Sequence, residues 1–224
     1  MKHIALLTTL LLSASLQAVE KPYDYVFFEN SLMKGDYFYS QAKYTSPSWI
    51  KNARHHLPVA GSVAFTPGNS LELTYVSAPG GDWYSEIQYC PVRGNDFFRE
   101  PSTLSMQVRL RESMNAAALP NIAIRYADST YTQYLNLRNY LKDTRPGVWH
   151  PVSIPLEDFG LNAVNDTNIK KLAAVALRPG TADGNEYTIY LDDIELLPAS
   201  LPSVSALNAP VLQEAKAYER HIDI

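Results

Sequence analysis

The sequence predicts an all-β fold, an antiparallel sandwich of two sheets, and three observations support this prediction. From Tyr23 onward apolar and polar residues alternate with a period of two rather than 3.6. Clusters of Gly, Pro, Asn and Asp bound the alternating runs. Helical signals are scarce, and only 156–162 and 166–171 have the pattern of single helical turns. About ten short strands that need cover on both faces indicate a sandwich, most simply a jelly roll.

Each predicted strand is an alternating run between turn residues. The run 71–76 lies between Pro67-Gly68-Asn69 and Pro79-Gly80-Gly81, and Asp128-Ser129 suits a tight turn between two later strands. Trp149 is predicted to be a core residue, because Val152 and Ile154 of its strand face inward. In chain order the predicted strands are 23–28, 59–65, 71–76, 83–89, 104–110, 122–126, 131–138, 149–154, 172–177 and 187–197.

The two ends of the chain differ from this body. Residues 1–18 have a short basic start, an apolar run at 4–12 and a small-residue end at Ala18, which is the pattern of a secretory signal peptide. The apolar run is shorter than the ~20 residues that span a bilayer, and no later stretch is apolar enough to be a transmembrane segment. We therefore expect an exported protein, periplasmic, secreted or at the cell surface. Its single β-sandwich domain occupies 19–198, and a Pro-containing linker and strand-like tail occupy 199–224.

Composition excludes several classes of protein. With 46% hydrophobic and 19% charged residues among 224, the chain is too apolar to be disordered. A formal net charge of -4 and a pI near 5.7 argue against nucleic acid as a partner. One cysteine excludes a disulfide framework and a multi-cysteine zinc site.

The outward strand positions form an unusual polar set. A merely solvated face would be rich in Lys and Glu, whereas these positions carry amides, guanidinium groups and phenols, with alanines between them. Amides and guanidinium groups give directional hydrogen bonds to hydroxyls, and tyrosine adds a flat apolar ring. This combination predicts a carbohydrate-binding cleft. The candidate contacts are Tyr84, Glu86, Gln88, Gln107, Arg109, Arg125, Tyr134, Asn136 and Arg178.

Two alternatives to this cleft stay open at this point. The polar set could be an ordinary sheet face covered by a neighbouring domain. Sugar could also bind at the loops, where aromatic residues crowd two segments. The first segment contains Tyr37, Tyr39, Tyr44 and Trp49, and the second contains Trp83 and Tyr84. Trp83 has the same parity as Ile87 in its predicted strand, which favours burial of Trp83.

Four segments, in order, resemble jelly-roll carbohydrate-binding modules of the galactose-binding-like fold. The segment 147–159 matches W-x-x-V-x-I-P-L-x-D-F, and 95–108 resembles the preceding D-[FW] and L-S-F-x-V strand region. Downstream, 175–180 and 189–194 resemble A-x-x-P-G and I-Y-I-D-D-I. The chain is similar over about 25–197 to family 11 carbohydrate-binding modules and to the complex I intermediate-associated protein 30 fold. Its ends, 25–30 and 218–224, also resemble the front of large bacterial glycan-degrading enzymes.

The resemblance implies a non-catalytic module that binds a polysaccharide or oligosaccharide in an exported polysaccharide-degradation system, with a glycoside hydrolase catalytic module as a possible partner. Many such modules hold a structural Ca²⁺, which here would lie between Glu29 and Asp192 or Asp193, helped by carbonyls near 34–36. Oxygen ligands suit that ion. The alternative is that these carboxylates are strand-edge charges.

An enzyme is the second reading of the sequence. A glycosidase needs two carboxylates across a bond, and nothing in the sequence pairs its carboxylates. No G-x-S-x-G elbow is present. A small β-sandwich polysaccharide lyase or glycoside hydrolase would rely first on His150, Tyr134 and Arg125. A third reading is a structural module that docks a neighbouring catalytic domain.

Overall fold

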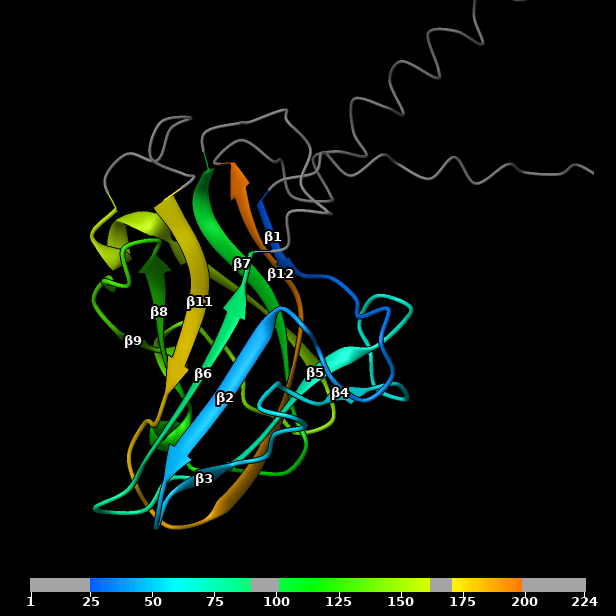
Figure 1. The fold of residues 1–224 in the computed structure, drawn as a ribbon, viewed down its shortest axis with the longest axis vertical. Coiled ribbons are helices and arrows are strands. Elements are labelled where there is room, and N and C mark those ends of the chain that lie inside the picture. Colours follow the sequence, from blue (N-terminus) through cyan, green and yellow to red (C-terminus); the bar gives the residue numbers. More distant parts are fainter. Residues whose placement is uncertain (1–24, 90–100, 162–170, 199–224) are drawn as a thin grey trace, which may run out of the picture.

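The computed structural model describes residues 25–89, 101–161 and 171–198, which fold into two stacked antiparallel sheets (Figure 1). One sheet has seven strands in the order β10-β7-β12-β5-β3, with β1 paired to β12 and β4 to β5. The other has five strands in the order β2-β6-β11-β8-β9. The predicted antiparallel sandwich is confirmed.

Most strands are short, and the described residues include three 3-10 turns between them. β12 is the longest, and it pairs with β5, β7 and β1. The strands are β1 Tyr25–Phe28, β2 Ser40–Thr45, β3 Trp49–Ile50, β4 Val59–Ala60, β5 Ser70–Val76, β6 Asp82–Gln88, β7 Pro101–Leu110, β8 Asn121–Tyr126, β9 Leu135–Asn136, β10 Trp149–Pro155, β11 Leu172–Arg178 and β12 Glu186–Pro198. The turns are η1 Ala116–Ala118, η2 Leu137–Asn139 and η3 Leu156–Phe159.

The core lies between the two sheets and takes every second residue of the long strands. On β7 the buried positions are Leu104, Met106, Val108 and Leu110, which are the even-numbered residues of the alternating run. Val175 of β11 faces them from the other sheet as part of the same core cluster. Period-two alternation therefore sets which side chains lie inside, because successive residues of a strand point to opposite faces.

β2 and two shortened strands differ from the prediction, for two reasons. β2 was not predicted, because Ala42 is its only apolar inward residue ahead of the exposed Tyr44. The predicted strand 59–65 is a strand only at β4, and the predicted strand 131–138 only at β9. In both regions the chain leaves the ladder and is held by side-chain hydrogen bonds, which residue periodicity does not report.

Trp149 is not a core residue, so that prediction is wrong. β10 buries His150, Val152 and Ile154, and Trp149 has the opposite parity. It is half-buried on the outer surface of the sheet, where its ring meets Phe65 edge-on.

Several predictions lie outside the described residues. They are the signal peptide at 1–18, the linker and tail at 199–224, and nearly all of the predicted turn at 166–171. The predicted turn at 156–162 is η3. Within the described ranges no helix is long and apolar enough to cross a membrane.

Candidate functional site

The outer face of the five-stranded sheet brings together seven of the nine sugar-contact candidates. Register places Gln41 beside Glu86, Lys43 beside Tyr84, and Ala176 between Glu86 and Ala123. We call this surface the polar face. Its predicted members are Tyr84, Glu86, Gln88, Arg125, Tyr134, Asn136 and Arg178, and the structure adds Gln41, Lys43, Asn121 and Tyr131.

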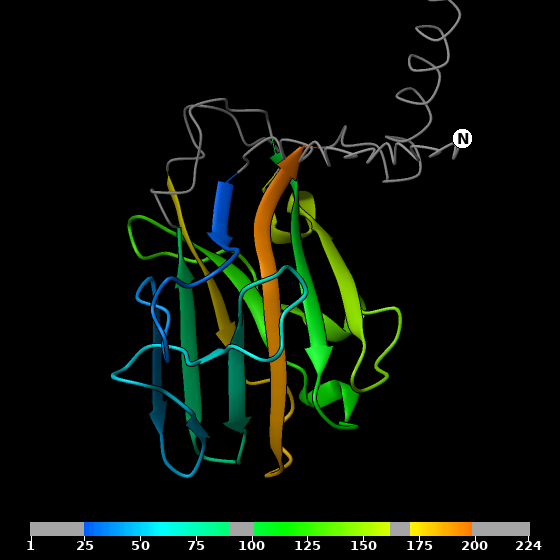
Figure 2. The same cartoon turned by 90° about the vertical axis from the view of Figure 1, so that its right-hand side faces the viewer.

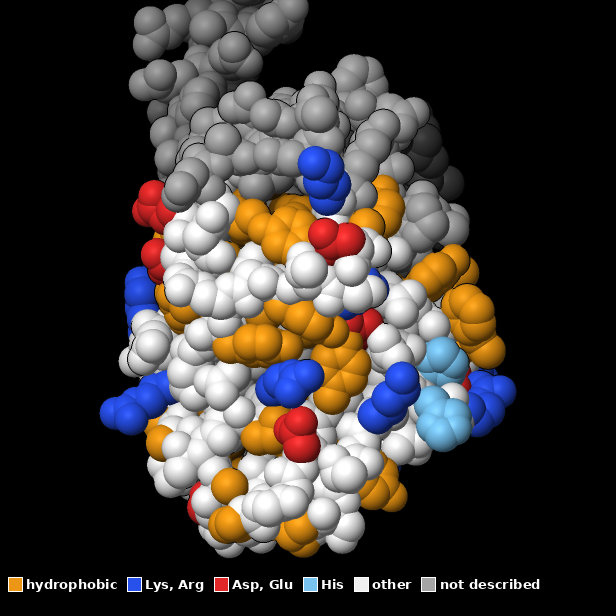
Figure 3. Space-filling view, turned by 60° about the vertical axis from the view of Figure 1, so that its left-hand side comes forward, with side chains coloured by type: hydrophobic (Ala, Val, Ile, Leu, Met, Phe, Trp, Pro, Cys, Tyr) orange, Lys and Arg blue, Asp and Glu red, His pale blue; other side chains and the backbone are white. Residues whose placement is uncertain are grey.

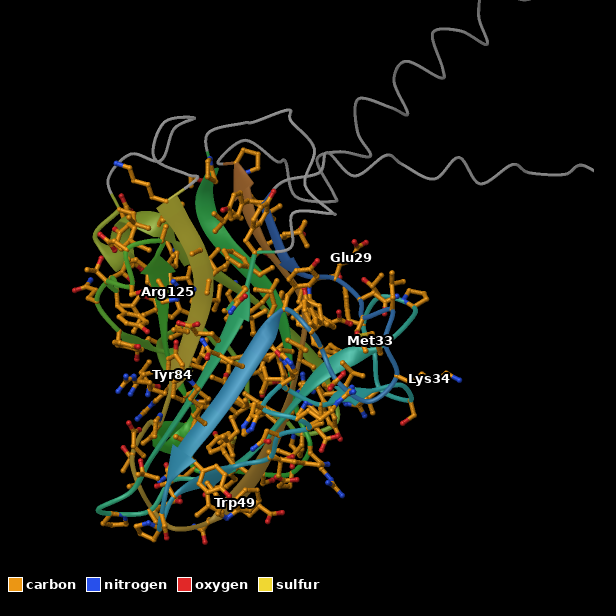
Figure 4. All side chains as sticks on the ribbon, viewed as in Figure 1. Glu29, Met33, Lys34, Trp49, Tyr84 and Arg125 are labelled. Atoms are coloured by element: carbon orange, nitrogen blue, oxygen red, sulfur yellow. The ribbon has the colours of Figure 1, made fainter. Side chains whose placement is uncertain are left out.

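Charged and apolar side chains are interspersed on this side of the molecule. Figure 3 shows apolar side chains gathered over the middle of the side, with single basic and acidic groups between them. In Figure 4, Tyr84 and Arg125 lie on the left, on the sheet, far from Glu29 on the right and from Trp49 at the lower end.

The alanines of the polar face are covered rather than open. Ala123, Ala174 and Ala176 are fully buried although they point away from the core. Their small side chains let the long side chains of neighbouring strands close over them. The layer that solvent reaches is therefore formed by the tyrosines and arginines above these alanines.

Glu86 is the centre of the polar face and is 1% exposed. Its carboxylate forms an ion pair with Arg125, with Nε and Oε1 2.5 Å apart, and accepts hydrogen bonds from the side chains of Gln41 and Tyr131. These partners come from β8, β2 and the chain after β8. Burial, together with the nearby Glu86 carboxylate, raises the pKa of Tyr131. Glu86 thus fixes side chains from three segments.

Three tyrosines and Arg178 form the exposed layer. The hydroxyls of Tyr84 and Tyr131 are 3.1 Å apart, and the rings of Tyr131 and Tyr134 stack with centroids 6.0 Å apart. The Arg178 guanidinium lies 5.5 Å from the centre of the Tyr84 ring and 5.7 Å from that of Tyr134. Its Nη1 is 3.4 Å from Asp82. Burial raises the pKa of Tyr134, against the opposing effect of Arg178.

This arrangement can hold a polyhydroxylated ring. Tyrosine rings present flat apolar surface to C–H groups, and the hydroxyls of Tyr84 and Tyr131, the Arg178 guanidinium and the amide of Gln88 can exchange hydrogen bonds with sugar hydroxyls. The side chain of Asn136 stabilises the neighbouring backbone instead. Its amide donates to the carbonyl of Leu119 and to Asn121, and its oxygen caps η2 by accepting from Arg138.

Gln107 and Arg109 do not lie on the polar face, so their predicted place in one common cleft is wrong. Both are on β7, in the seven-stranded sheet (Figure 2). Gln107 pairs with Pro151 and Asp192, and Arg109 pairs with Trp149 and Tyr190. The parity prediction for β7 was sound, but residue alternation does not reveal to which sheet a strand belongs.

Sequence reasoning missed Gln41, Lys43 and Tyr131. The first two alternate with Ser40 and Ala42, a pattern too poor in apolar residues to indicate a strand. Around Tyr131 the assumed parity was one residue off: Thr132 turns inward and its Oγ1 accepts from the Ile124 N–H at 3.0 Å. The buried threonine leaves Tyr131 outside, 37% exposed.

The loop aromatics are divided between core and surface. Tyr37 is buried and donates its hydroxyl to the carbonyl of Phe27, and Trp83 is buried as its parity predicted. Tyr39 and Trp49 are half-buried. Tyr44 is 55% exposed, at the end of β2.

The two aspartates predicted as calcium ligands accept hydrogen bonds from a neighbouring loop. Asp192 accepts hydrogen bonds from the backbone N–H groups of Phe65, Thr66 and Asp193, and Asp193 accepts from the Thr66 hydroxyl. Both aspartates therefore hold the loop 61–69. In the part of the chain that the structure describes, no three His, Cys, Asp or Glu side chains form a group that could hold a metal ion, so Glu29 does not complete one. Calcium binding stays a prediction, which a melting curve with and without a chelator checks.

The residues first suspected of catalysis are separated. His150 faces the core from β10, where its Nε2 lies 2.9 Å from the carbonyl oxygen of Arg145. Arg125 and Tyr134 lie on the polar face of the other sheet. This trio therefore does not form one acid–base site.

Comparison with known proteins gives one family and several similar structures. The model of "Carbohydrate binding domain 30" matches residues 24–197. The family 30 module of the cellulosomal cellulase Cel9D-Cel44B of Clostridium thermocellum is 16% identical, with a TM-score of 0.55 over 79% of this chain and 98% of that chain. Another family 30 module is 17% identical, with a TM-score of 0.53 over 83% and 95% of the two chains. A family 11 module from Clostridium thermocellum is 13% identical, with a TM-score of 0.48 over 72% and 90%.

Proposed function

Because the chain belongs to the family of carbohydrate-binding domain 30, we propose that its polar face holds an oligosaccharide or a stretch of polysaccharide without chemically changing it. The observation that carries this proposal is the tyrosine layer. Tyr84, Tyr131 and Tyr134 lie together beside Arg178, above side chains that Glu86 fixes. Such a preformed surface binds sugar with little loss of side-chain entropy.

The test is a glycan array followed by calorimetric titration of the best neutral ligand. β-Glucans are sensible first probes, because a similar structure is a module of a cellulase. We expect Tyr134→Ala to weaken binding about tenfold, the loss that about 1.4 kcal/mol of stacking and contact energy represents. Arg178→Ala, which removes the exposed guanidinium of the polar face, tests the hydrogen-bonding component in the same titration. Unchanged affinity in both variants would contradict the polar face as the binding site.

We further propose that the protein is exported and works beside a catalytic module that degrades glycans. The signal-like pattern of residues 1–18 supports export, and the cellulase origin of a similar structure supports the enzymatic context. N-terminal sequencing of the mature protein from the periplasm or the medium checks the first part. An N-terminus that still begins at Met1 in the cytoplasm would contradict it.

A further inference from the structure

The outer face of the seven-stranded sheet carries a second row of aromatic and charged residues. Trp149 on β10 pairs with Arg109 on β7, and Arg109 pairs with Tyr190 on β12. Tyr190 pairs in turn with Glu72 on β5. Directly paired residues of neighbouring strands point to the same face, so these four side chains cross the sheet as one row. Neighbouring strands are about 4.8 Å apart, which places Trp149 and Tyr190 about 10 Å apart with Arg109 between them.

A loop holds another aromatic ring against this row. The segment 61–69 crosses in front of β12 (Figure 2, cyan). Asp192 fixes it there by accepting from the N–H groups of Phe65 at 2.7 Å and Thr66 at 3.2 Å, and the Thr66 hydroxyl donates to Asp193 at 2.7 Å. The Phe65 ring is 50% exposed and meets Trp149 edge-on, with centroids 6.0 Å apart. We leave out Glu72, which pairs with Lys51, and call Trp149, Arg109, Tyr190 and Phe65 the tryptophan row.

Arg109 is the cation of the tryptophan row, and no ion pair joins it to a carboxylate of the described residues. Its Nε is buried and has no hydrogen-bond partner among the described residues. The other cations on this face are matched: Lys51 lies 2.6 Å from Glu72, and Arg111 lies 3.9 Å from Glu112. Asp192 points to the same face, but its carboxylate serves the loop N–H groups. A buried donor without an acceptor destabilises the fold, and more so when it is charged.

These observations indicate that the tryptophan row lacks an anionic partner for Arg109. A neutral ligand would leave the guanidinium without an ionic partner, whereas a carboxylate would satisfy it through charge-assisted hydrogen bonds. The flanking indole and phenol rings offer flat apolar surface at the spacing of two strands. We propose that the tryptophan row is a second glycan-binding site, which takes a sugar bearing a carboxylate: the pyranose ring packs on Trp149 beside Phe65, and the uronate carboxylate pairs with Arg109. The inference rests on the carbohydrate-binding role of the chain, but on no residue of the polar face.

The test is calorimetric titration of the full chain with an oligouronate and with the same oligosaccharide after reduction of its carboxyl groups. We expect the oligouronate to bind at least tenfold more tightly, and this preference to shrink as salt is raised, because exposed ion pairs are screened. Arg109→Gln should remove the preference. Arg111→Gln is the matched control, because it removes a cation that directly follows β7 and already lies near Glu112, and it should leave the preference intact.

Two further variants keep the outcome clear. Trp149→Phe preserves an aromatic ring and the fold, and it identifies the Trp149 indole N–H signal in an NMR spectrum; that signal should shift when the wild-type chain meets the oligouronate. Tyr44→Ala, near the end of β2 and on neither outer face, should leave oligouronate affinity unchanged. Equal binding of the two oligosaccharides, or a preference that survives Arg109→Gln, would overturn the second site. Neither result touches neutral-glycan binding on the polar face, which Tyr134→Ala tests separately.

Discussion

The two outer faces of the sandwich each bury a carboxylate, and they satisfy it in different ways. Glu86 on the polar face meets a guanidinium, an amide and a phenol. Asp192 on the opposite face is 0% exposed and meets backbone N–H groups and a second carboxylate, Asp193. Burial, with the Asp193 charge beside it, raises the pKa of Asp192 to about 6. The first face uses its carboxylate to fix side chains, and the second uses it to fix a loop.

The largest effect should follow from removing the carboxylate on the polar face. Glu86→Ala leaves Arg125 largely buried without its counter-ion, and breaking a buried ion pair in this way costs about 3–5 kcal/mol in the free energy of unfolding. Urea denaturation measures the loss. Glu72→Ala is the control: it breaks the Lys51 pair, where the lysine is half exposed, and should cost no more than about 1 kcal/mol. Equal losses in the two variants would mean that Glu86 is no more than a surface charge.

On the opposite face, the contribution of Asp192 to the free energy of unfolding depends on pH. A carboxyl whose pKa is raised from 3.8 to about 6 by folding binds its proton more tightly in the folded state. Its contribution to stability is therefore full below about pH 4 and is lost as the pH rises through about 6, by roughly 2–3 kcal/mol at most. Asp192→Asn stays neutral at every pH. The difference in unfolding free energy between wild type and Asp192→Asn should thus shift in favour of the variant between pH 4 and 6. A constant difference across that range would show that Asp192 titrates normally.

The smallest effect should be seen at an aromatic residue that lies on neither outer face. Tyr44 is more exposed than Tyr131, so exposure alone would make it the better sugar contact. It lies at the end of β2, apart from the tyrosine layer. We expect Tyr44→Ala to leave glycan affinity within about twofold of wild type in the same titration as Tyr134→Ala. A tenfold loss would move the binding site to the loop end of the sandwich.

Periodicity predicted the fold well and the site only in part. The inward residues of β7, β8 and β11 follow from alternation, and so do the polar positions of β6 and β11. Two of the failures have physical causes that alternation does not report. Sheet membership depends on long-range pairing, so Arg109 was grouped with Arg125 although they lie in different sheets. Irregular backbone shifts parity, so Tyr131 was missed. Trp149 was misplaced for a simpler reason, because its parity opposes that of Val152 and the apolar character of the indole outweighed it.

The pairing of β1 with β12 has a mechanical consequence. Tyr25, where β1 begins, lies opposite Leu196, near the end of β12, and the two strands are antiparallel. Both ends of this pair lie at the same pole in Figure 1. A force that separates Tyr25 from Leu196 would break the hydrogen bonds between β1 and β12 one after another (unzipping geometry), and not all at once (shear geometry). Under tension between these two points, β1 would peel away first, while the ladder of β12 with β5 and β7 keeps the core closed.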